Sequence, residues 1–313
     1  MTITQLHYIL AVAEYQNFTL AAEKCFVTQP TLSMQIQKLE EELDIKIFDR
    51  NKKPIQLTEV GKKIVEQAKS IVNESDRIKD IVDQQKGFIG GDFKVGIIPT
   101  IMPTLLPMFL KNFINKYPKV NLIVEEYHTE EIISRLRKGQ LDAAIAATPL
   151  NEADLKEIVL YYEPFVGYFP SEFRQNLKQL TPNDLNINDI LLLQDGHCFT
   201  NGILNICKAS KLEPSQKFEL TSGSFETLVR LSNEGLGVTL LPYLHTINLN
   251  DNDKKNILEF ADPKPSREVS LIFPKSELKQ HIIDALRSTI SGVIKGAIAF
   301  QDIEIISPKI QQK

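Results

Sequence analysis

Two of the chain's three cysteines, Cys198 and Cys207, lie nine residues apart in the stretch LLLQDGHCFTNGILNICKAS, residues 191–210. A thiolate can attack a peroxide, and two thiols can be oxidised together to a disulfide. Small buried cysteines can also serve only as apolar filling. The spacing therefore poses a choice between a reactive pair and two packing residues.

The local pattern places the two thiols at different points of one helix. ILLLQ is typical of a buried strand, DGH of a tight connection, and FTNGILNICKAS of a helix. Cys198 then lies at or near the helix N-terminus, where the helix dipole and free N–H groups lower a thiol pKa and where His197 could assist. Cys207 lies inside the helix and packs most simply as an apolar residue.

An intact helix keeps the two sulfurs apart. Nine residues at about 1.5 Å rise and about 100° rotation each separate them by roughly 13 Å on opposite faces. A disulfide needs Cα atoms within about 4.4–6.8 Å, so oxidation must unwind the helix. Gly202, which costs about 1 kcal/mol relative to Ala in a helix, would make unwinding easier. We expect Cys198 to react with a peroxide and Cys207 to condense with the resulting sulfenic acid.

The whole chain limits what kind of protein can carry this segment. Its 313 residues indicate two or three domains. Hydrophobic residues at 42% and charged residues at 24% are typical of a folded globular protein. We expect no signal peptide and no membrane span, hence a cytoplasmic protein, and no cofactor or metal. A net charge of −4 requires any nucleic-acid binding to come from a local basic patch.

The first sixty residues predict helix, turn, helix and then a basic turn. Apolar spacing indicates a helix over 4–14, a second helix LAAEKCF capped by Asn17 or Thr19, and a third that begins near Pro30. KIFDRNKKPIQLT would form a wing that neutralises phosphates. Because residues 1–60 carry six Lys and Arg against eight Asp and Glu, DNA binding depends on where the charges lie. The candidate DNA contacts are Gln29, Pro30, Thr31, Ser33, Gln35, Lys38, Arg50, Lys52 and Lys53. The alternative is a small protein-interaction module.

Residues 58–86 continue as one long helix with an apolar seam. The seam residues are spaced 4, 3, 4, 3, 4, which is typical of a helix that pairs with a partner: Ile64, Ala68, Ile71, Ser75, Ile78 and Val82. An amphipathic helix packed on its own domain is the simpler alternative. FIGGD then indicates a hinge, and strands alternate with helices from residue 93 onward, which predicts α/β structure.

These motifs resemble the LysR family of bacterial transcription regulators. The resemblance rests on AAEKCFVTQPTLSMQIQKLEEEL, the wing at Arg50, LTEVGK, LDAAIA and EGLGVTLLP. It implies an α+β multidomain fold: a winged helix-turn-helix, a linker helix, and a two-subdomain α/β regulatory domain like periplasmic binding proteins. The implied divisions are 1–58 (DNA-binding domain), 59–87 (dimerisation helix), 88–92 (hinge), 93–163 with 268–302 (regulatory subdomain I), 164–267 (subdomain II) and 303–313 (tail).

The cysteine segment is similar to that of the hydrogen-peroxide-sensing activators in this family. By that resemblance Cys198 is the sensing thiol and Cys207 its resolver, while Thr100, Thr129 and His197 line the peroxide site. Arg267 falls where the family has a basic residue near the reactive cysteine. Two positions depart from the usual Arg and Asp, namely Thr200 and Asn201, which bears on how fast Cys198 reacts. Considered alone, Thr100 and Thr129 are more simply helix caps, and Cys25 a core residue.

The resemblance implies double-stranded operator DNA, RNA polymerase, hydrogen peroxide and a cellular thiol reductant as partners of a homodimer or homotetramer that is not an enzyme.

Three alternatives remain open. The same fold could respond to a small metabolite in a cleft between the subdomains, with packing cysteines. The chain could be a thiol peroxidase, which leaves the N-terminal helices unexplained. A zinc site of Cys198, Cys207 and His197 lacks a fourth nearby ligand.

Overall fold

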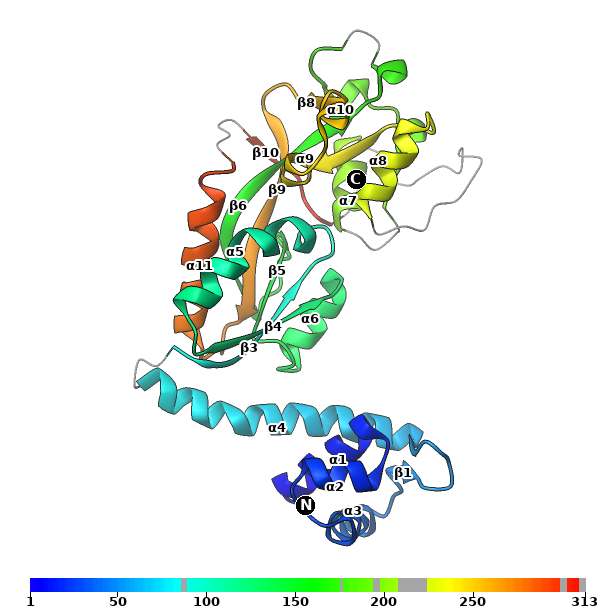
Figure 1. The fold of residues 1–313 in the computed structure, drawn as a ribbon, viewed down its shortest axis with the longest axis vertical. Coiled ribbons are helices and arrows are strands. Elements are labelled where there is room, and N and C mark those ends of the chain that lie inside the picture. Colours follow the sequence, from blue (N-terminus) through cyan, green and yellow to red (C-terminus); the bar gives the residue numbers. More distant parts are fainter. Residues whose placement is uncertain (86–88, 175–176, 194–197, 208–223, 299–302, 310–313) are drawn as a thin grey trace. The chain divides into compact units, whose positions relative to one another are not determined.

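The computed structural model describes residues 1–85, 89–174, 177–193, 198–207, 224–298 and 303–309. These residues form two compact units, one of residues 1–86 with 138–140 and a larger one of residues 87–137 with 141–313 (Figure 1). In the described part of the chain, no helix is both long enough and apolar enough to cross a membrane.

The smaller unit contains the expected helix-turn-helix and two-stranded wing. Its elements are α1 (Ile3–Tyr15), α2 (Phe18–Lys24), α3 (Gln29–Glu42), β1 (Phe48–Asp49), β2 (Gln56–Leu57) and α4 (Glu59–Gln85). Thr2 starts α1 with a capping box, and the Asn17 side chain accepts the N–H groups of Thr19 and Leu20 to cap α2. Ile9, Leu32, Ile36 and Leu39 are fully buried among these helices. The predicted helical head is confirmed.

Helix α4 divides its apolar seam into two parts. Toward its N-terminus, Ala68 is buried and Ile64 and Ile71 are partly buried against the core of the head. Further along, Ile78 is 65% exposed and Val82 46% exposed. The first part therefore packs on its own domain, as the simpler alternative holds, whereas the second part leaves apolar side chains in solvent.

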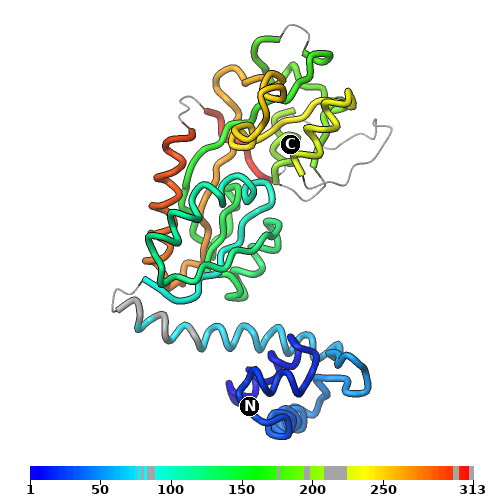
Figure 2. The backbone as a smooth tube through the Cα atoms, in the orientation of Figure 1, coloured from blue at the N-terminus to red at the C-terminus, as the bar shows by residue number. Residues whose placement is uncertain are grey.

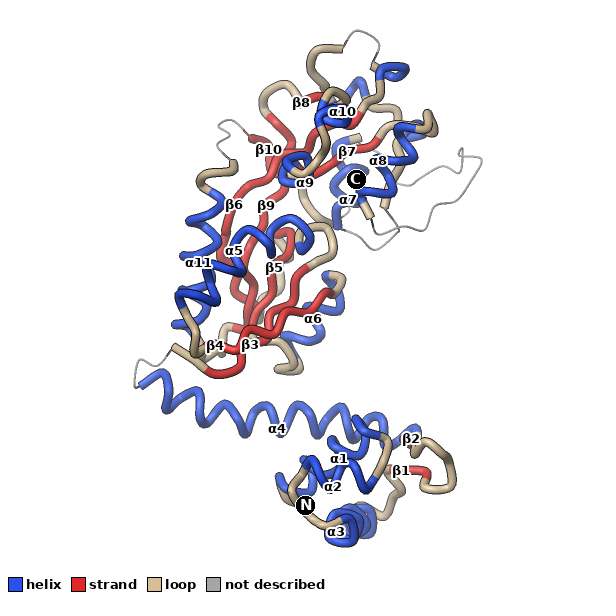
Figure 3. Tube along the Cα trace, viewed as in Figure 1, coloured by secondary structure: helices blue, strands red, loops and turns tan. Residues whose placement is uncertain are grey.

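The larger unit is built on one continuous strand path in the order β4-β3-β5-β9-β6-β7 (Figure 3). Its strands are β3 (Gly91–Ile97), β4 (Val120–Glu126), β5 (Ala143–Thr148), β6 (Leu155–Tyr168), β7 (Thr239–Pro242), β8 (Ile257–Glu259), β9 (Lys264–Pro274) and β10 (Ile303–Ile305). Its helices are α5 (Met102–Lys116), α6 (Thr129–Arg137), α7 (Cys198–Ile206), α8 (Phe225–Asn233), α9 (Tyr243–Ile247), α10 (Asp251–Lys254) and α11 (Gln280–Ile294).

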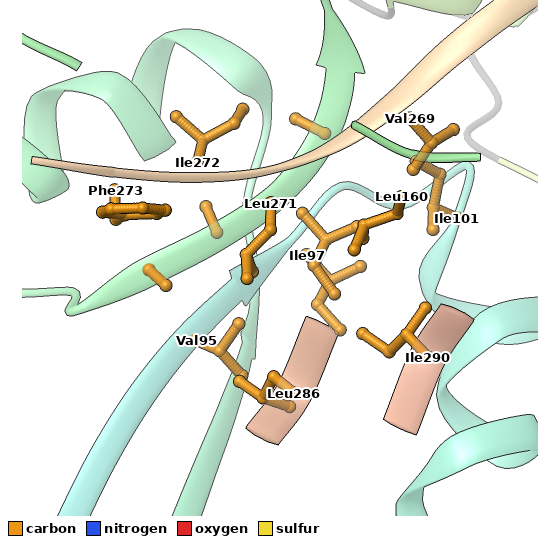
Figure 4. Close-up of a cluster of buried hydrophobic side chains, with 14 of the residues drawn as sticks. Val95, Ile97, Ile101, Leu160, Val269, Leu271, Ile272, Phe273, Leu286 and Ile290 are labelled. Carbon is orange, nitrogen blue, oxygen red and sulfur yellow. The ribbon is translucent and has the colours of Figure 1, made fainter. Parts of the chain in front are cut away.

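Two long antiparallel strands join the two halves of this unit. β6 and β9 pair from Leu155 opposite Pro274 to Pro164 opposite Ser266, so the chain leaves the first half on β6 and returns on β9 (Figure 2). One core lies around β3, β5 and β9 with α5 and α11, and part of it is drawn in Figure 4. A second core lies around the far end of β6, with α7, α8 and β7. The α+β multidomain fold expected from the sequence is confirmed.

One predicted strand is wrong. Among the described residues of this run, 190–193, only Ile190 forms a β-bridge, to Val238, and it does so as an isolated residue pair. Leu191, Leu192 and Leu193 are nevertheless buried in the second core, because an apolar run can be buried without continuing a sheet. The strand expected over KFELT, residues 217–221, lies outside the described residues.

Candidate functional sites

Cys198 is the first residue of α7 and lies where the two cores of the larger unit meet. Its side chain is buried and belongs to the first core, whereas the ring of Phe199 belongs to the second. The Phe199 ring packs against Phe165 and Phe225, with centroids 4.8 and 4.9 Å away. The start of the helix is therefore fixed by aromatic packing on one side and by the first core on the other.

A buried ion pair lies beside this thiol. Arg267 on β9 donates from Nε and Nη2 to Oε2 of Glu163 on β6, at 2.9 and 2.7 Å. Its Nη1 donates to the Thr100 hydroxyl at 3.0 Å, and Nη2 also donates to the Thr100 carbonyl at 3.1 Å. Oε1 of Glu163 accepts the N–H of Leu244 at 2.8 Å. Each carboxylate oxygen thus has a donor, and the guanidinium is held in one orientation.

The ion pair is almost completely withdrawn from solvent. The side chains of Arg267 and Glu163 are 4% and 1% exposed. Removing either partner would leave an uncompensated buried charge, at a cost of about 3–5 kcal/mol. Below the guanidinium, the Phe199 ring has its centroid 5.3 Å from Cζ of Arg267. The Arg267 guanidinium is therefore held in place beside Cys198.

Opposing effects act on the pKa of Cys198. Burial raises the pKa of the thiol, and this is the larger effect. The Arg267 cation, a hydrogen bond with the Thr129 side chain, and the N–H groups of Cys198 and Phe199 lower the same pKa. The net shift is upward, so the thiolate expected from the helix N-terminus alone is opposed by burial. These four lowering groups all stabilise negative charge on the sulfur when it forms.

Cys207 has different surroundings. It follows the last residue of α7, its N–H bonds the carbonyl of Ile203 at 2.9 Å, and it packs against the second core. Burial raises the pKa of this thiol to about 11. The helix is thus continuous between the two cysteines, both are free thiols, and helical geometry keeps them roughly 13 Å apart along the axis.

The structure brings most of the predicted site residues together. Arg267 and Thr129 act directly on Cys198, and Thr100 joins the site through its hydrogen bonds with Arg267, while His197 lies outside the described residues. Thr100 is not a helix cap, because α5 begins two residues later and the hydroxyl instead accepts from Arg267. Thr129 is the first residue of α6.

The two positions that depart from the family pattern have structural partners. The Thr200 hydroxyl donates to the Leu193 carbonyl at 3.1 Å. The Asn201 amide donates to the carbonyl of Pro308, near the C-terminus, at 3.2 Å. Thr200 therefore ties the first turn of α7 to the segment before it, and Asn201 ties the helix to the end of the chain.

Two residues of the site were not singled out from the sequence. Glu163 stands in the apolar run LYYEPFVGY, and a lone carboxylate within a buried strand is a signal for a buried cation. Tyr161 is two residues earlier on the same face of β6, and its buried hydroxyl has no hydrogen-bond partner among the described residues. Burial raises the pKa of Tyr161 well above its ordinary range. No pattern in the sequence distinguishes Tyr161 from an ordinary core aromatic residue.

The second candidate site is the surface of α3 and the wing. Leu32, Ile36 and Leu39 turn into the core of the head, so the polar residues expected to contact DNA lie on the other faces of the helix. Gln29, Pro30, Thr31 and Lys38 are exposed, Ser33 and Gln35 are partly buried, and Arg50, Lys52 and Lys53 are exposed. The arrangement presents the first turns of α3 and the wing cations together to solvent.

Arg50 has structural contacts as well as an exposed position. Its guanidinium donates to the Ser33 hydroxyl at 3.1 Å and to Oε2 of the buried Glu40 at 3.4 Å. Oε1 of Glu40 accepts the N–H groups of Ile47 and Phe48 at 2.7 and 3.2 Å. Glu40, which the sequence did not single out, therefore fixes the wing to α3.

Comparison of the sequence with known families finds two matches. Residues 3–62 match the profile of the bacterial regulatory helix-turn-helix proteins of the LysR family, and residues 86–293 match the LysR substrate binding domain. The second match ends at residue 293, so the last residues of the chain lie beyond it. Among curated proteins, the hydrogen peroxide-inducible genes activator of Pectobacterium carotovorum is 31% identical over 94% of this chain and 99% of its own length. The DNA-binding transcriptional dual regulator OxyR of Escherichia coli K12 is 31% identical over 95% of this chain and 100% of its own.

Solved structures give the same grouping. A full-length OxyR variant from Pseudomonas aeruginosa superposes with a TM-score of 0.72 at 33% identity, covering 93% of this chain and 98% of that one. A Corynebacterium glutamicum OxyR variant with hydrogen peroxide bound superposes with a TM-score of 0.62 at 27% identity, covering 95% and 93%.

Proposed function

The chain belongs to the LysR family of DNA-binding transcription regulators, and from this premise we propose that it is an activator of oxidative-stress genes that senses hydrogen peroxide through Cys198 and Cys207. One observation carries the proposal: a buried thiol starts a helix beside a fixed guanidinium, and a second thiol ends the same helix. The names of the relatives support the choice of peroxide as the signal.

The groups around Cys198 suit the first chemical step. Attack of the thiolate on one peroxide oxygen breaks the O–O bond, gives a sulfenic acid at Cys198, and releases hydroxide, which takes up a proton to become water. Arg267 and the backbone N–H groups stabilise the thiolate, and one N–H on Nη1 of Arg267 has no acceptor among the described residues. Thr129 and Thr100 supply hydroxyls nearby, and His197 is assigned to the same site by resemblance.

The second step needs α7 to open. The Cys207 thiol displaces water from the sulfenic acid, so a disulfide forms, two thiols have been oxidised, and one peroxide has been reduced to two waters. Because the intact helix holds the sulfurs apart, the disulfide and the helical form of α7 exclude one another. A cellular thiol reductant would restore the helix. The helical dithiol form and the disulfide form of residues 198–207 are the two states by which the regulator would report peroxide.

The helical head would carry the response by binding DNA. We assign the winged helix-turn-helix of residues 1–58 to operator DNA, with the exposed start of α3 in the major groove and Lys52 and Lys53 on phosphates. The apolar side chains exposed late in α4, within the linker of residues 59–87, suit pairing of two protomers on two half-sites. RNA polymerase is the further partner of an activator. Residues 93–163 with 268–302, and 164–267, form the two regulatory subdomains, joined to the linker by the hinge at 88–92.

Peptide mass mapping after treatment with equimolar peroxide tests this function. We expect one intramolecular disulfide between Cys198 and Cys207, and a trappable sulfenic acid at Cys198 when Cys207→Ser removes the resolving thiol. Cys25→Ser is the matched control, because Cys25 packs at the end of α2 and its replacement leaves the disulfide yield unchanged. Free thiols at both Cys198 and Cys207 after treatment would refute peroxide sensing by this pair.

A further inference from the structure

The end of the chain lies against the helix that joins the two cysteines. β10, residues Ile303–Ile305, pairs parallel with Lys264–Ser266 at the start of β9, and the N–H of Ile306 continues this pairing to the Ser266 carbonyl at 2.8 Å. Ser266 directly precedes Arg267. We call the segment 303–309 the C-terminal clasp. It lies beyond residue 293, where the match to the family profile ends.

Two amides of α7 hold the clasp. Asn201 donates to the Pro308 carbonyl at 3.2 Å, and Asn205 donates to the carbonyls of Ser307 and Lys309 at 2.9 and 3.0 Å. The two asparagines are four residues apart and therefore share one face of the helix. Apolar contact accompanies these bonds, since Ile306 packs against the second core.

The far end of the clasp is tied to another part of the unit. Nζ of Lys309 hydrogen-bonds the carbonyl of Leu150, and it pairs with Glu152 at 3.2 Å. Pro308, between the two anchor points, is buried. The clasp thus runs from the strand that carries Arg267, across α7, to the loop after β5.

The positions of the two asparagines link the clasp to the redox step. Both lie between Cys198 and Cys207, inside the nine-residue segment that must rearrange before the sulfurs can bond. The three carbonyl acceptors are met together only while α7 is helical, because residues four apart lie about 6 Å apart along a helix but about 13 Å apart in an extended chain. We infer that Asn201 and Asn205 are positioning residues that, by binding the C-terminal clasp, stabilise the dithiol form over the Cys198–Cys207 disulfide.

This inference rests on the proposed formation of the Cys198–Cys207 disulfide. It adds a contribution to the equilibrium between the dithiol form and the disulfide form. A bond present in the dithiol form and absent from the disulfide form makes oxidation less favourable and lets cellular thiols reverse it more readily. Among the described residues, the clasp hydrogen-bonds α7, residues 264–266 and the loop after β5, and none of these bonds reaches the side chain of Arg267 or Thr129. We therefore expect the clasp to act on the second step and to leave the first unchanged. Full-length protein with Asn201→Ala and Asn205→Ala separates the two effects.

Titration of the disulfide against glutathione measures the equilibrium. We expect the double variant to favour the disulfide about tenfold more than the unmodified chain, which is about 30 mV for a two-electron couple. In a Cys207→Ser background, Asn205→Ala alone keeps the rate of sulfenic acid formation at Cys198 within about twofold, because only Asn201 stands at a position that bears on that rate. With Cys207 present, the condensation rate of the double variant rises. A second variant that ends at residue 306 removes the three acceptors, leaves α7 and β10 in place, and gives the same shift.

Asn112→Ala is the matched control, because Asn112 is exposed on α5, far along the chain from the cysteines, and its loss leaves both measurements unchanged. An unchanged glutathione equilibrium in both clasp variants, with the disulfide still forming, overturns the clasp inference alone. Absence of the Cys198–Cys207 disulfide in every protein, the unmodified chain included, overturns the proposed function and the inference together.

Discussion

At the residue scale, the reactivity of Cys198 is a balance between burial and one fixed cation. Burial raises the pKa of the thiol, and Arg267 is the first of the groups that lower it. Glu163 holds Arg267 through two hydrogen bonds and offsets part of its charge. The Cys198 thiol is thereby kept protonated more than its helix position alone would dictate, yet its thiolate is stabilised once formed.

Substitutions in the ion pair shift the pH dependence of peroxide reaction in opposite directions. Arg267→Gln combined with Glu163→Gln removes the lowering effect, so the pKa of Cys198 rises and the rate at pH 7 falls on the order of tenfold per pKa unit. Glu163→Gln alone leaves the cation less neutralised, so the pKa falls and the rate at pH 7 rises. Stopped-flow rates across pH measure both.

The sign of this pH effect can be checked at high pH. Above the pKa of Cys198 in each protein the thiol is fully ionised, so the rate difference that comes from ionisation disappears there, and the double variant, whose thiol pKa is higher, reacts no more slowly than the unmodified chain. Arg230→Gln, which removes an exposed cation paired with Glu226, is the control and leaves the profile unchanged. Coincident profiles for the double variant and the unmodified chain would show that Arg267 does not act on the thiol.

At the element scale, α7 shows what a sequence can and cannot reveal about a helix. Its spacing predicts the helix and the separation of Cys198 and Cys207, because both follow from the backbone period. Helix propensity alone marks Gly202 as a weak point. The structure gives Gly202 a packing reason as well, since a Cβ there would lie 3.0 Å from Cζ of Phe165.

Gly202→Ala therefore destabilises the reduced protein. Helix propensity favours Ala by about 1 kcal/mol, but displacing the buried Phe165 ring costs about 1–3 kcal/mol, so the unfolding free energy falls by about 1 kcal/mol. Chemical denaturation under reducing conditions measures the change. In a Phe165→Leu background the contact is gone, and the same substitution becomes neutral or stabilising. Stabilisation by Gly202→Ala in the unmodified chain would show that helix propensity prevails over packing.

At the scale of the whole molecule, periodic features are predictable and long-range partners are not. The helices of the head and the alternation of strands and helices follow from repeating apolar spacings, so the amino-acid sequence alone predicts them. The contact of Asn201 with Pro308 joins residues 107 positions apart, and the ion pair of Arg267 with Glu163 joins residues 104 apart. No local pattern encodes such pairs. The strand expected over ILLLQ failed for a related reason, since burial alone does not specify pairing.

Charge placement also belongs to the whole molecule, since the chain has a net charge of −4 and must bind DNA through a few exposed cations. Lys52→Gln with Lys53→Gln weakens binding to operator and unrelated DNA alike, and lowers the slope of log K against log salt by about 2 per head, because each lost phosphate contact contributes about 0.9. Fluorescence anisotropy at several salt concentrations measures this slope. Lys111→Gln with Lys116→Gln removes two exposed charges from α5 and leaves the slope unchanged, so equal losses in both double variants would mean that net charge, and not the wing, governs binding.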